Sequence, residues 1–206
     1  MSGVHPAVDL PVAAGEPTTV LALKEWAAVV HALLDGRQTV LLRKGGIHEK
    51  RFSLRGSRFV VFPTVAHSHL ESTRDEHADL LPLGSADVID SAGSLVVRAE
   101  LEVVEAIAVR RPDRIGDLEP FHIWTTESVR RNRIDFRPRH ELSAIVVRAR
   151  PLAAPVTVPL LPEYAGCRSW VDLDPGSFAD VPRLGPVHDD ALLLGIAAQV
   201  RAAVGP

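Results

Sequence analysis

Apolar residues recur at helical spacing near both ends of the chain. Residues 20–35 place them at Leu23, Trp26, Ala27, Val30, Leu33 and Leu34. This spacing predicts an amphipathic helix that Thr18 or Thr19 caps and Gly36 ends. Residues 188–204 predict a second amphipathic helix, whose apolar face carries Leu192, Leu193, Ile196, Ala197 and Val200.

Segments rich in Val, Leu and Thr lie between these helices and predict strands. They cover residues 37–43, 58–62, 94–109, 143–148 and 169–173. Apolar and charged residues alternate along the third of these, and its length predicts a bent strand. We expect Pro63 and Pro151 to end their strands, so that the proline-rich run 152–162 crosses the surface.

Two further segments lack a strand pattern. Residues 125–131 predict a short helix, and the polar segment 67–79 predicts an exposed helix or a loop. Short strands that do not alternate regularly with long helices favour an α+β fold over a doubly wound sheet.

The length of 206 residues fits one domain. We expect a single α+β domain over residues 19–206, with a small mixed or barrel-like β-sheet and an amphipathic helix near each end. Residues 1–18 show no periodicity and predict a flexible tail.

Composition bears on the partners and the cellular compartment that we expect for the protein. A net charge of -3 argues against coating nucleic acid through global charge, but it allows a local basic patch. The single cysteine, Cys167, excludes an intramolecular disulfide and a thiolate zinc cluster, which favours a reducing compartment. The sequence shows neither a signal peptide nor a run of about 20 apolar residues. We therefore expect a cytoplasmic protein without membrane contact, and no motif predicts a cofactor.

Positive charge gathers in two segments. Between residues 43 and 58 it comes from Arg43, Lys44, Lys50, Arg51, Arg55 and Arg58, against the single acid Glu49. Between residues 130 and 140 it comes from Arg130, Arg131, Arg133, Arg137 and Arg139, with His140 beside them. Asp135 and Glu141 offset this second cluster only in part. The sequence leaves open whether the two segments share one face.

Guanidinium groups and the backbone N–H groups of a double-glycine turn suit phosphate oxygens, because both present donors in fixed geometry. The predicted ligand-binding residues are Arg43, Lys44, Gly45, Gly46, Lys50, Arg51, Arg130, Arg131, Arg133 and Arg137. Trp124 and Phe136 bracket the second cluster and are candidates for stacking on bases. The alternative is that both segments are solvated surface and that both rings lie in the core.

Metal chemistry is a second hypothesis. His67, His69, His77, Glu71 and Glu76 are ligand types for a divalent metal, and Asp87, Asp90, Glu100 and Glu102 surround the start of the long strand. The spacing is not diagnostic, and Glu102 stands where restriction-type nucleases place a lysine. Unliganded histidines and a salt-bridged strand are the simpler interpretation. The double glycine fits neither a P-loop nor a dinucleotide-binding motif.

Three segments carry a family resemblance: ALKEWAAVVHALLDGRQTVLLRKGGI at 22–47, FVVFPT at 59–64 and YAGCRSWVDL at 164–173. They resemble the bacterial family catalogued as domain of unknown function 1802, over residues 21 to about 173. That family has no established activity or catalytic residues. The resemblance implies only a link, through domain fusions, to restriction-type nucleases.

The helix followed by GRQTVLLRK is also similar to the opening of ASCH and other PUA-like domains, small β-barrels that bind RNA or modified nucleotides. This similarity implies that Arg43, Lys44 and Gly45 lie at a cleft edge. The chain departs from the ASCH pattern GxKxxExR, because Gln38 and Leu41 replace its lysine and glutamate.

Three functions remain open. The first is a non-catalytic module that binds nucleic acid or a nucleotide, in which replacing Arg43 and Lys44 by alanine weakens binding without unfolding the protein. The alternatives are a metal-dependent hydrolase or nuclease that uses His67, His69, Glu100 or Glu102, and a protein-interaction module. The sequence decides neither whether the protein is an enzyme nor its oligomeric state.

Overall fold

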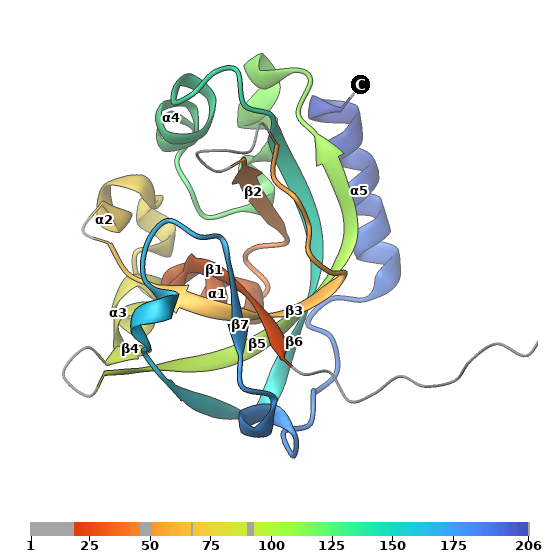
Figure 1. Ribbon diagram of the computed structural model, residues 1–206. Helices are drawn as coiled ribbons and strands as arrows, with labels where there is room; N and C mark the ends of the chain where they lie inside the picture. Colours follow the sequence, from red (N-terminus) through yellow and green to blue (C-terminus); the bar gives the residue numbers. More distant parts are fainter. Residues whose placement is uncertain (1–18, 46–50, 67, 90–92, 206) are drawn as a thin grey trace, which may run out of the picture.

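The computed structural model describes residues 19–45, 51–66, 68–89 and 93–205. One mixed sheet of seven strands forms its centre (Figure 1). The strands are β1 (Val20–Trp26), β2 (Val40–Lys44), β3 (Arg58–Thr64), β4 (Val88–Ile89), β5 (Ser94–Ala108), β6 (Leu142–Pro159) and β7 (Trp170–Leu173). The order across the sheet is β2-β6-β5-β3-β1-β7, and β4 pairs with β5. Only β1 and β3 run parallel. The predicted α+β class is confirmed.

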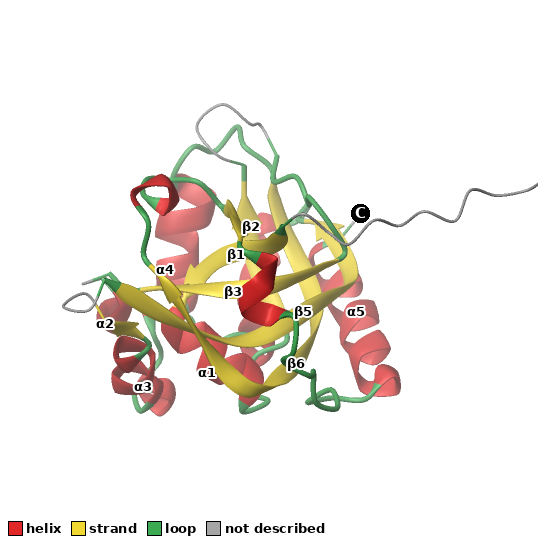
Figure 2. Ribbon diagram, turned by 60° about the horizontal axis from the view of Figure 1, so that its bottom comes forward, coloured by secondary structure: helices red, strands yellow, loops and turns green. Residues whose placement is uncertain are grey.

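Helical segments lie around the sheet (Figure 2). The α-helices are α1 (Ala27–Leu34), α2 (His69–Ser72), α3 (Leu80–Ala86), α4 (Thr126–Val129) and α5 (Asp190–Val204). The 3₁₀ helices are η1 (Asp75–His77), η3 (Pro112–Phe121), η5 (Pro162–Tyr164) and η6 (Pro175–Phe178), and a π-helix, η4 (Arg130–Asp135), follows α4 directly. No helix in the described ranges is long and apolar enough to cross a membrane. The predicted tail at 1–18 lies outside those ranges.

The prediction of one amphipathic helix over 20–35 is wrong in its first half. Residues 20–26 form β1, which pairs with β3 on one side and β7 on the other. Ala22 and Leu23 point to opposite faces of the sheet and are both fully buried. A strand buried on both faces does not alternate in polarity, so its apolar positions also fit a helical period. The helix begins only at Ala27, and most of its residues are buried.

The predicted stops at proline are also wrong. Strand β6 continues through Pro151 to Pro159, and β3 includes Pro63. Pro151 adjoins a register shift between β5 and β6. The ladder of backbone hydrogen bonds is already irregular there, so it tolerates a residue that has no N–H to donate. Pro63 pairs with β1 on one side, and the β5 ladder covers only residues 58–60 on the other. The prediction for 94–109 is confirmed, since β5 is one long strand with two register shifts.

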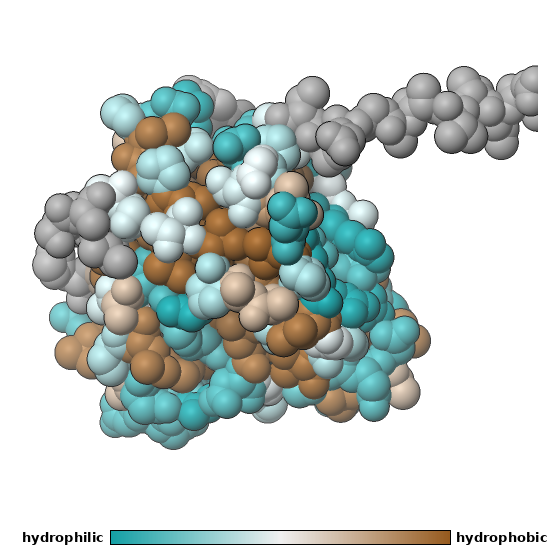
Figure 3. Space-filling model, turned by 90° about the horizontal axis from the view of Figure 1, so that it is seen from below, coloured by the Kyte–Doolittle hydropathy of each residue, from teal (hydrophilic) through white to brown (hydrophobic). Residues whose placement is uncertain are grey.

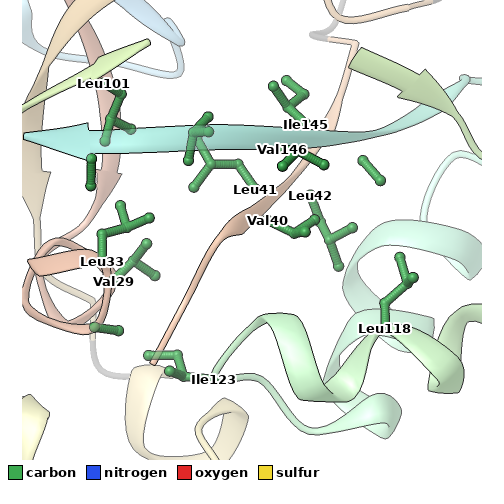
Figure 4. Close-up of a cluster of buried hydrophobic side chains, with 14 of the residues drawn as sticks. Val29, Leu33, Val40, Leu41, Leu42, Leu101, Leu118, Ile123, Ile145 and Val146 are labelled. Carbon is green, nitrogen blue, oxygen red and sulfur yellow. The ribbon is translucent and has the colours of Figure 1, made fainter. Parts of the chain in front are cut away.

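Two hydrophobic cores form on the sheet. The larger includes Leu23, Phe59 and Val61 and joins the sheet to α1, η3 and α5, and the smaller includes Ala22, Val60 and Phe62. Figure 4 shows side chains of α1, β2, β5 and β6 gathered in the larger core. On the face seen in Figure 3, hydrophobic residues lie across the middle beside hydrophilic ones. The predicted C-terminal helix is confirmed as α5, whose N–H at Leu192 donates to the side chain of Asp189 at 2.8 Å.

Gly84 sets the closest approach between α1 and α3. A Cβ there would lie 2.6 Å from the backbone nitrogen of Ala28 and 2.8 Å from the carbonyl carbon of Ala27. We expect Gly84→Ala to lower the free energy of unfolding by about 2–3 kcal/mol, because one of the helices has to move. Urea denaturation measures the change.

Gly195→Ala in α5 is the matched control. A Cβ at Gly195 meets nothing within 4 Å, so alanine should leave the stability unchanged or raise it by about 0.5–1 kcal/mol. Equal effects of the two substitutions would contradict a tight α1–α3 contact.

Candidate anion-binding site

A buried ion pair joins β1 to β2, although β6, β5 and β3 lie between them in the sheet. Arg43 Nη1 donates to Glu25 Oε2 at 3.1 Å and to the carbonyl oxygen of Lys24 at 3.1 Å. The two side chains are only 12% and 6% exposed. The sheet therefore curls until side chains from strands near its two edges meet.

The Glu25 carboxylate is held from two sides. Its Oε1 accepts the N–H of Trp26 at 2.9 Å, and its Oε2 accepts from Arg43. The backbone at the same residue is fixed from β3, since Thr64 Oγ1 donates to the Glu25 carbonyl oxygen at 3.0 Å. The end of β1 thus presents a preorganised carboxylate at the start of α1.

A second guanidinium, that of Arg133 in η4, lies beside this pair. Burial lowers the pKa of Arg133 below its ordinary value, Arg43 lowers it further, and Glu25 partly offsets the effect. Within the described ranges, no carboxylate lies at ion-pair distance from Arg133. Glu25 therefore pairs with Arg43 alone, and the Arg133 guanidinium beside them adds a second positive charge in a partly buried place.

Aromatic rings line the same corner. The Trp26 ring stacks on His69 with centroids 3.7 Å apart and meets the Trp124 ring edge-on at 4.3 Å. A small hollow of about 20 Å³ opens between these two tryptophans and Arg133, and its other lining residues are Ser128, Val129 and Asn132. Arg133 and the two indole rings therefore border one space.

Lys44 ties the two predicted basic segments together. Its ammonium donates to the carbonyl oxygens of Arg133, Ile134 (3.3 Å) and Phe136 (2.6 Å). Burial, followed by the nearby Arg133, lowers the pKa of Lys44. His140 Nδ1 also lies 3.4 Å from the carbonyl oxygen of Gly45. The start of the first basic segment, at Lys44 and Gly45, thus lies beside the second, whereas Arg55 pairs with Asp172 and Arg58 with Glu102.

The other predicted ligand-binding residues divide by environment. Arg51, Arg130 and Arg131 are exposed, and Arg130 donates to the carbonyl oxygen of Asp113 at 2.9 Å. Gly45 is buried, and the Arg137 guanidinium lies 4.9 Å from the centre of the Phe136 ring. Gly46 and Lys50 lie outside the described ranges.

Arg43 and Lys44 are bonded into the fold, which changes what their replacement would do. Arg43→Ala would leave the Glu25 carboxylate buried without its partner, at a cost of about 3–5 kcal/mol. The geometry therefore predicts that the two alanines lower the stability of the fold as well as ligand binding. Arg133 is the better position at which to probe the site.

Four of the carboxylates proposed for a metal site form ion pairs, whereas Glu71 is exposed. Asp87 pairs with His31 at 2.8 Å and with Arg98, Glu100 pairs with Arg183 at 3.0 Å, and Glu102 pairs with Arg148 at 2.9 Å. Glu76 pairs with Arg74 at 3.3 Å, and His77 Nε2 lies 3.0 Å from a nitrogen of the same arginine. No group of three potential ligands meets in the described part of the chain, which does not include His67 and Asp90.

Sequence reasoning did not assign Glu25 or Trp26 to a site, because it placed both in an amphipathic helix, with Trp26 on the apolar face. The signal that could have found them is the charged pair Lys24-Glu25, which interrupts an otherwise apolar stretch. The ASCH pattern would place a glutamate at Leu41, but Leu41 lies in the core. The carboxylate that faces Arg43 comes from β1 instead.

Comparison with known proteins identifies the family of this chain. The family model described as domain of unknown function (DUF1802) matches residues 22–199. No curated protein matches the chain. Among solved structures, the ASCH protein from Zymomonas mobilis has 11% identity and a TM-score of 0.48, covering 82% of this chain and 100% of that chain. Two single-residue variants of that protein have 14% and 13% identity, with TM-scores of 0.46. They cover 78% and 79% of this chain and 94% and 93% of theirs.

Two buried histidines make the fold sensitive to acid. Burial lowers the pKa of His69 and of His122 to about 4 each, against about 6.5 in an unfolded chain. Between these values the unfolded chain binds protons that the folded chain does not, so stability is complete above pH 6.5 and falls toward pH 4. Each histidine contributes a slope of at most about 1.4 kcal/mol per pH unit.

Urea denaturation between pH 7.5 and 5 measures this slope. His69→Gln and His122→Gln should each remove about half of the histidine contribution. If both variants keep the full slope, the acid sensitivity comes from other groups.

Proposed function

We propose that this chain, which belongs to the DUF1802 family, is a binding module for a nucleotide or nucleic acid, held through its phosphate at Arg43 and Arg133. The observation that supports the proposal is the balance of charge around Glu25: one carboxylate faces the buried guanidinium of Arg43 and the partly buried guanidinium of Arg133. Buried charges are stable when they are paired and hydrogen-bonded. An anion that bonds to Arg133 would complete the pairing.

Phosphate suits this geometry better than a simple halide. A guanidinium presents parallel N–H donors that match two oxygens of a phosphate or carboxylate group. Arg43 uses Nη1 for Glu25 and the Lys24 carbonyl oxygen, and its orientation is fixed by these bonds. The exposed Arg130 and Arg131 extend the positive field outward from the cluster, which would draw an anionic ligand toward it.

The tryptophans favour a ligand that also carries a ring. Trp26 and Trp124 border the hollow beside Arg133, and indole faces and edges stack well on nucleobases. A hollow of about 20 Å³ is too small for a base, so a base would enter only if η4 moved outward. A π-helix is a rare conformation that is frequent at functional sites.

Arg133→Gln tests the proposal. We expect the dissociation constants for UMP and for a fluorescein-labelled 12-nucleotide strand to rise by about tenfold or more at low salt, because a charge-assisted contact is lost. The free energy of unfolding should stay the same or increase, since the variant removes a desolvated positive charge beside Arg43. Isothermal titration calorimetry, fluorescence polarisation and urea denaturation supply the measurements.

Arg201→Gln is the control, with the same change of charge on α5, where Arg201 forms an exposed ion pair with Glu105. It should bind both ligands like the wild type. The proposal fails if the wild type binds no phosphate-bearing ligand at low salt, or if Arg133→Gln binds as tightly as the control.

A further inference from the structure

We infer that Phe136 and Arg137 form a stacking platform for an unpaired base, so that the preferred ligand is a single-stranded polynucleotide, which binds more tightly than a free nucleotide. This inference rests on the proposed function and specifies its ligand. The two residues follow η4 directly and lie three and four positions after Arg133.

Phe136 is the phenylalanine that the fold leaves in water. Its exposed fraction is 57%, whereas Phe52, Phe59, Phe62 and Phe178 are exposed by 9% or less. The remaining phenylalanine, Phe121, is half-buried. A large apolar ring in solvent loses the stabilisation that burial would give, so a contact that covers Phe136 is favourable.

The backbone holds this ring in a defined position. Arg137 has a positive φ of 54°, a conformation that non-glycine residues seldom adopt, and its guanidinium lies 4.9 Å from the centre of the Phe136 ring. The Phe136 carbonyl oxygen accepts from the Lys44 ammonium at 2.6 Å. The backbone that carries the ring is therefore held in place, which lowers the cost of ordering this segment when a base binds.

Lys44 also connects the platform to the anion site. The same ammonium donates to the carbonyl oxygens of Arg133 and Phe136, so these two residues are close neighbours. A strand with a phosphate at Arg133 could therefore place an adjacent base on Phe136. The exposed Arg131 and Arg139 lie in the same segment, where further phosphates would pass.

The geometry favours a single strand over a duplex. An exposed phenyl ring stacks on the face of a base, and in a duplex those faces are covered by the neighbouring base pairs. Leu192 and Leu194 of α5 are also exposed, but a leucine has no aromatic ring that could stack on a base.

The test compares Phe136→Ala and Phe136→Trp with the wild type. The probes are labelled U12 RNA and dT12 DNA, their duplexes with A12 and dA12, and UMP. We expect Phe136→Ala to weaken binding of the single strands by about 5- to 100-fold. It should leave the UMP dissociation constant unchanged, and Phe136→Trp should retain strand binding. Arg133→Gln should weaken the binding of both UMP and the strands.

Leu194→Ala on α5, which removes a side chain that is 62% exposed, is the control for lost apolar surface. The platform is overturned if Phe136→Ala binds the single strands as tightly as the wild type does. It is also overturned if the wild type binds a duplex more tightly than a single strand. The proposed function would then still stand if Arg133→Gln loses UMP. Absence of binding to every probe overturns both. Comparing U12 RNA with dT12 DNA shows which kind of strand the protein binds. A loss of affinity in Phe136→Ala for either of them supports the inference.

Discussion

The ion pair between Glu25 and Arg43 is the constraint on which the site depends. It joins strands that the sheet order keeps apart, and it does so with side chains that solvent barely reaches. A second bridge supports it: Arg43 lies 5.1 Å from the centre of the Phe52 ring, and Phe52 stacks on Trp170 of β7 at 5.7 Å. The curl of the sheet is thus fixed by side chains where no ladder of backbone hydrogen bonds joins β2 to β7.

This closure explains why so much charge is found in a half-buried corner. The carboxylate must be there to hold Arg43, and η4 then brings Arg133 beside them. Lys44 donates hydrogen bonds to backbone carbonyl oxygens of the segment that contains Arg133, so the end of β2 and this segment are held together. This concentration of cations in one corner is the observation from which both proposals are argued.

The sequence predicts the long bent strand and the C-terminal helix, because each has a clear period of apolar residues. It predicts the α+β class because its short strands do not alternate regularly with long helices. It failed at β1, where burial on both faces removes the alternation that identifies a strand. It failed at Pro151, because the register shift that tolerates a proline depends on the partner strand. The basic residues of the candidate site were visible as a charge cluster. Glu25 was not, since only the curl of the sheet brings it to Arg43.

The position of β1 has a consequence for how the chain is made. Its ladder to β7 pairs Val20 with Leu173, so the ribosome synthesises this partner of β1 about 150 residues after β1 itself. At ordinary rates of translation this interval lasts roughly 10–30 s. During it, one edge of an apolar strand lacks its native neighbour and is open to other chains. The growing polypeptide therefore passes through an aggregation-prone stage on the ribosome, and chaperones that shield nascent strands would protect it there.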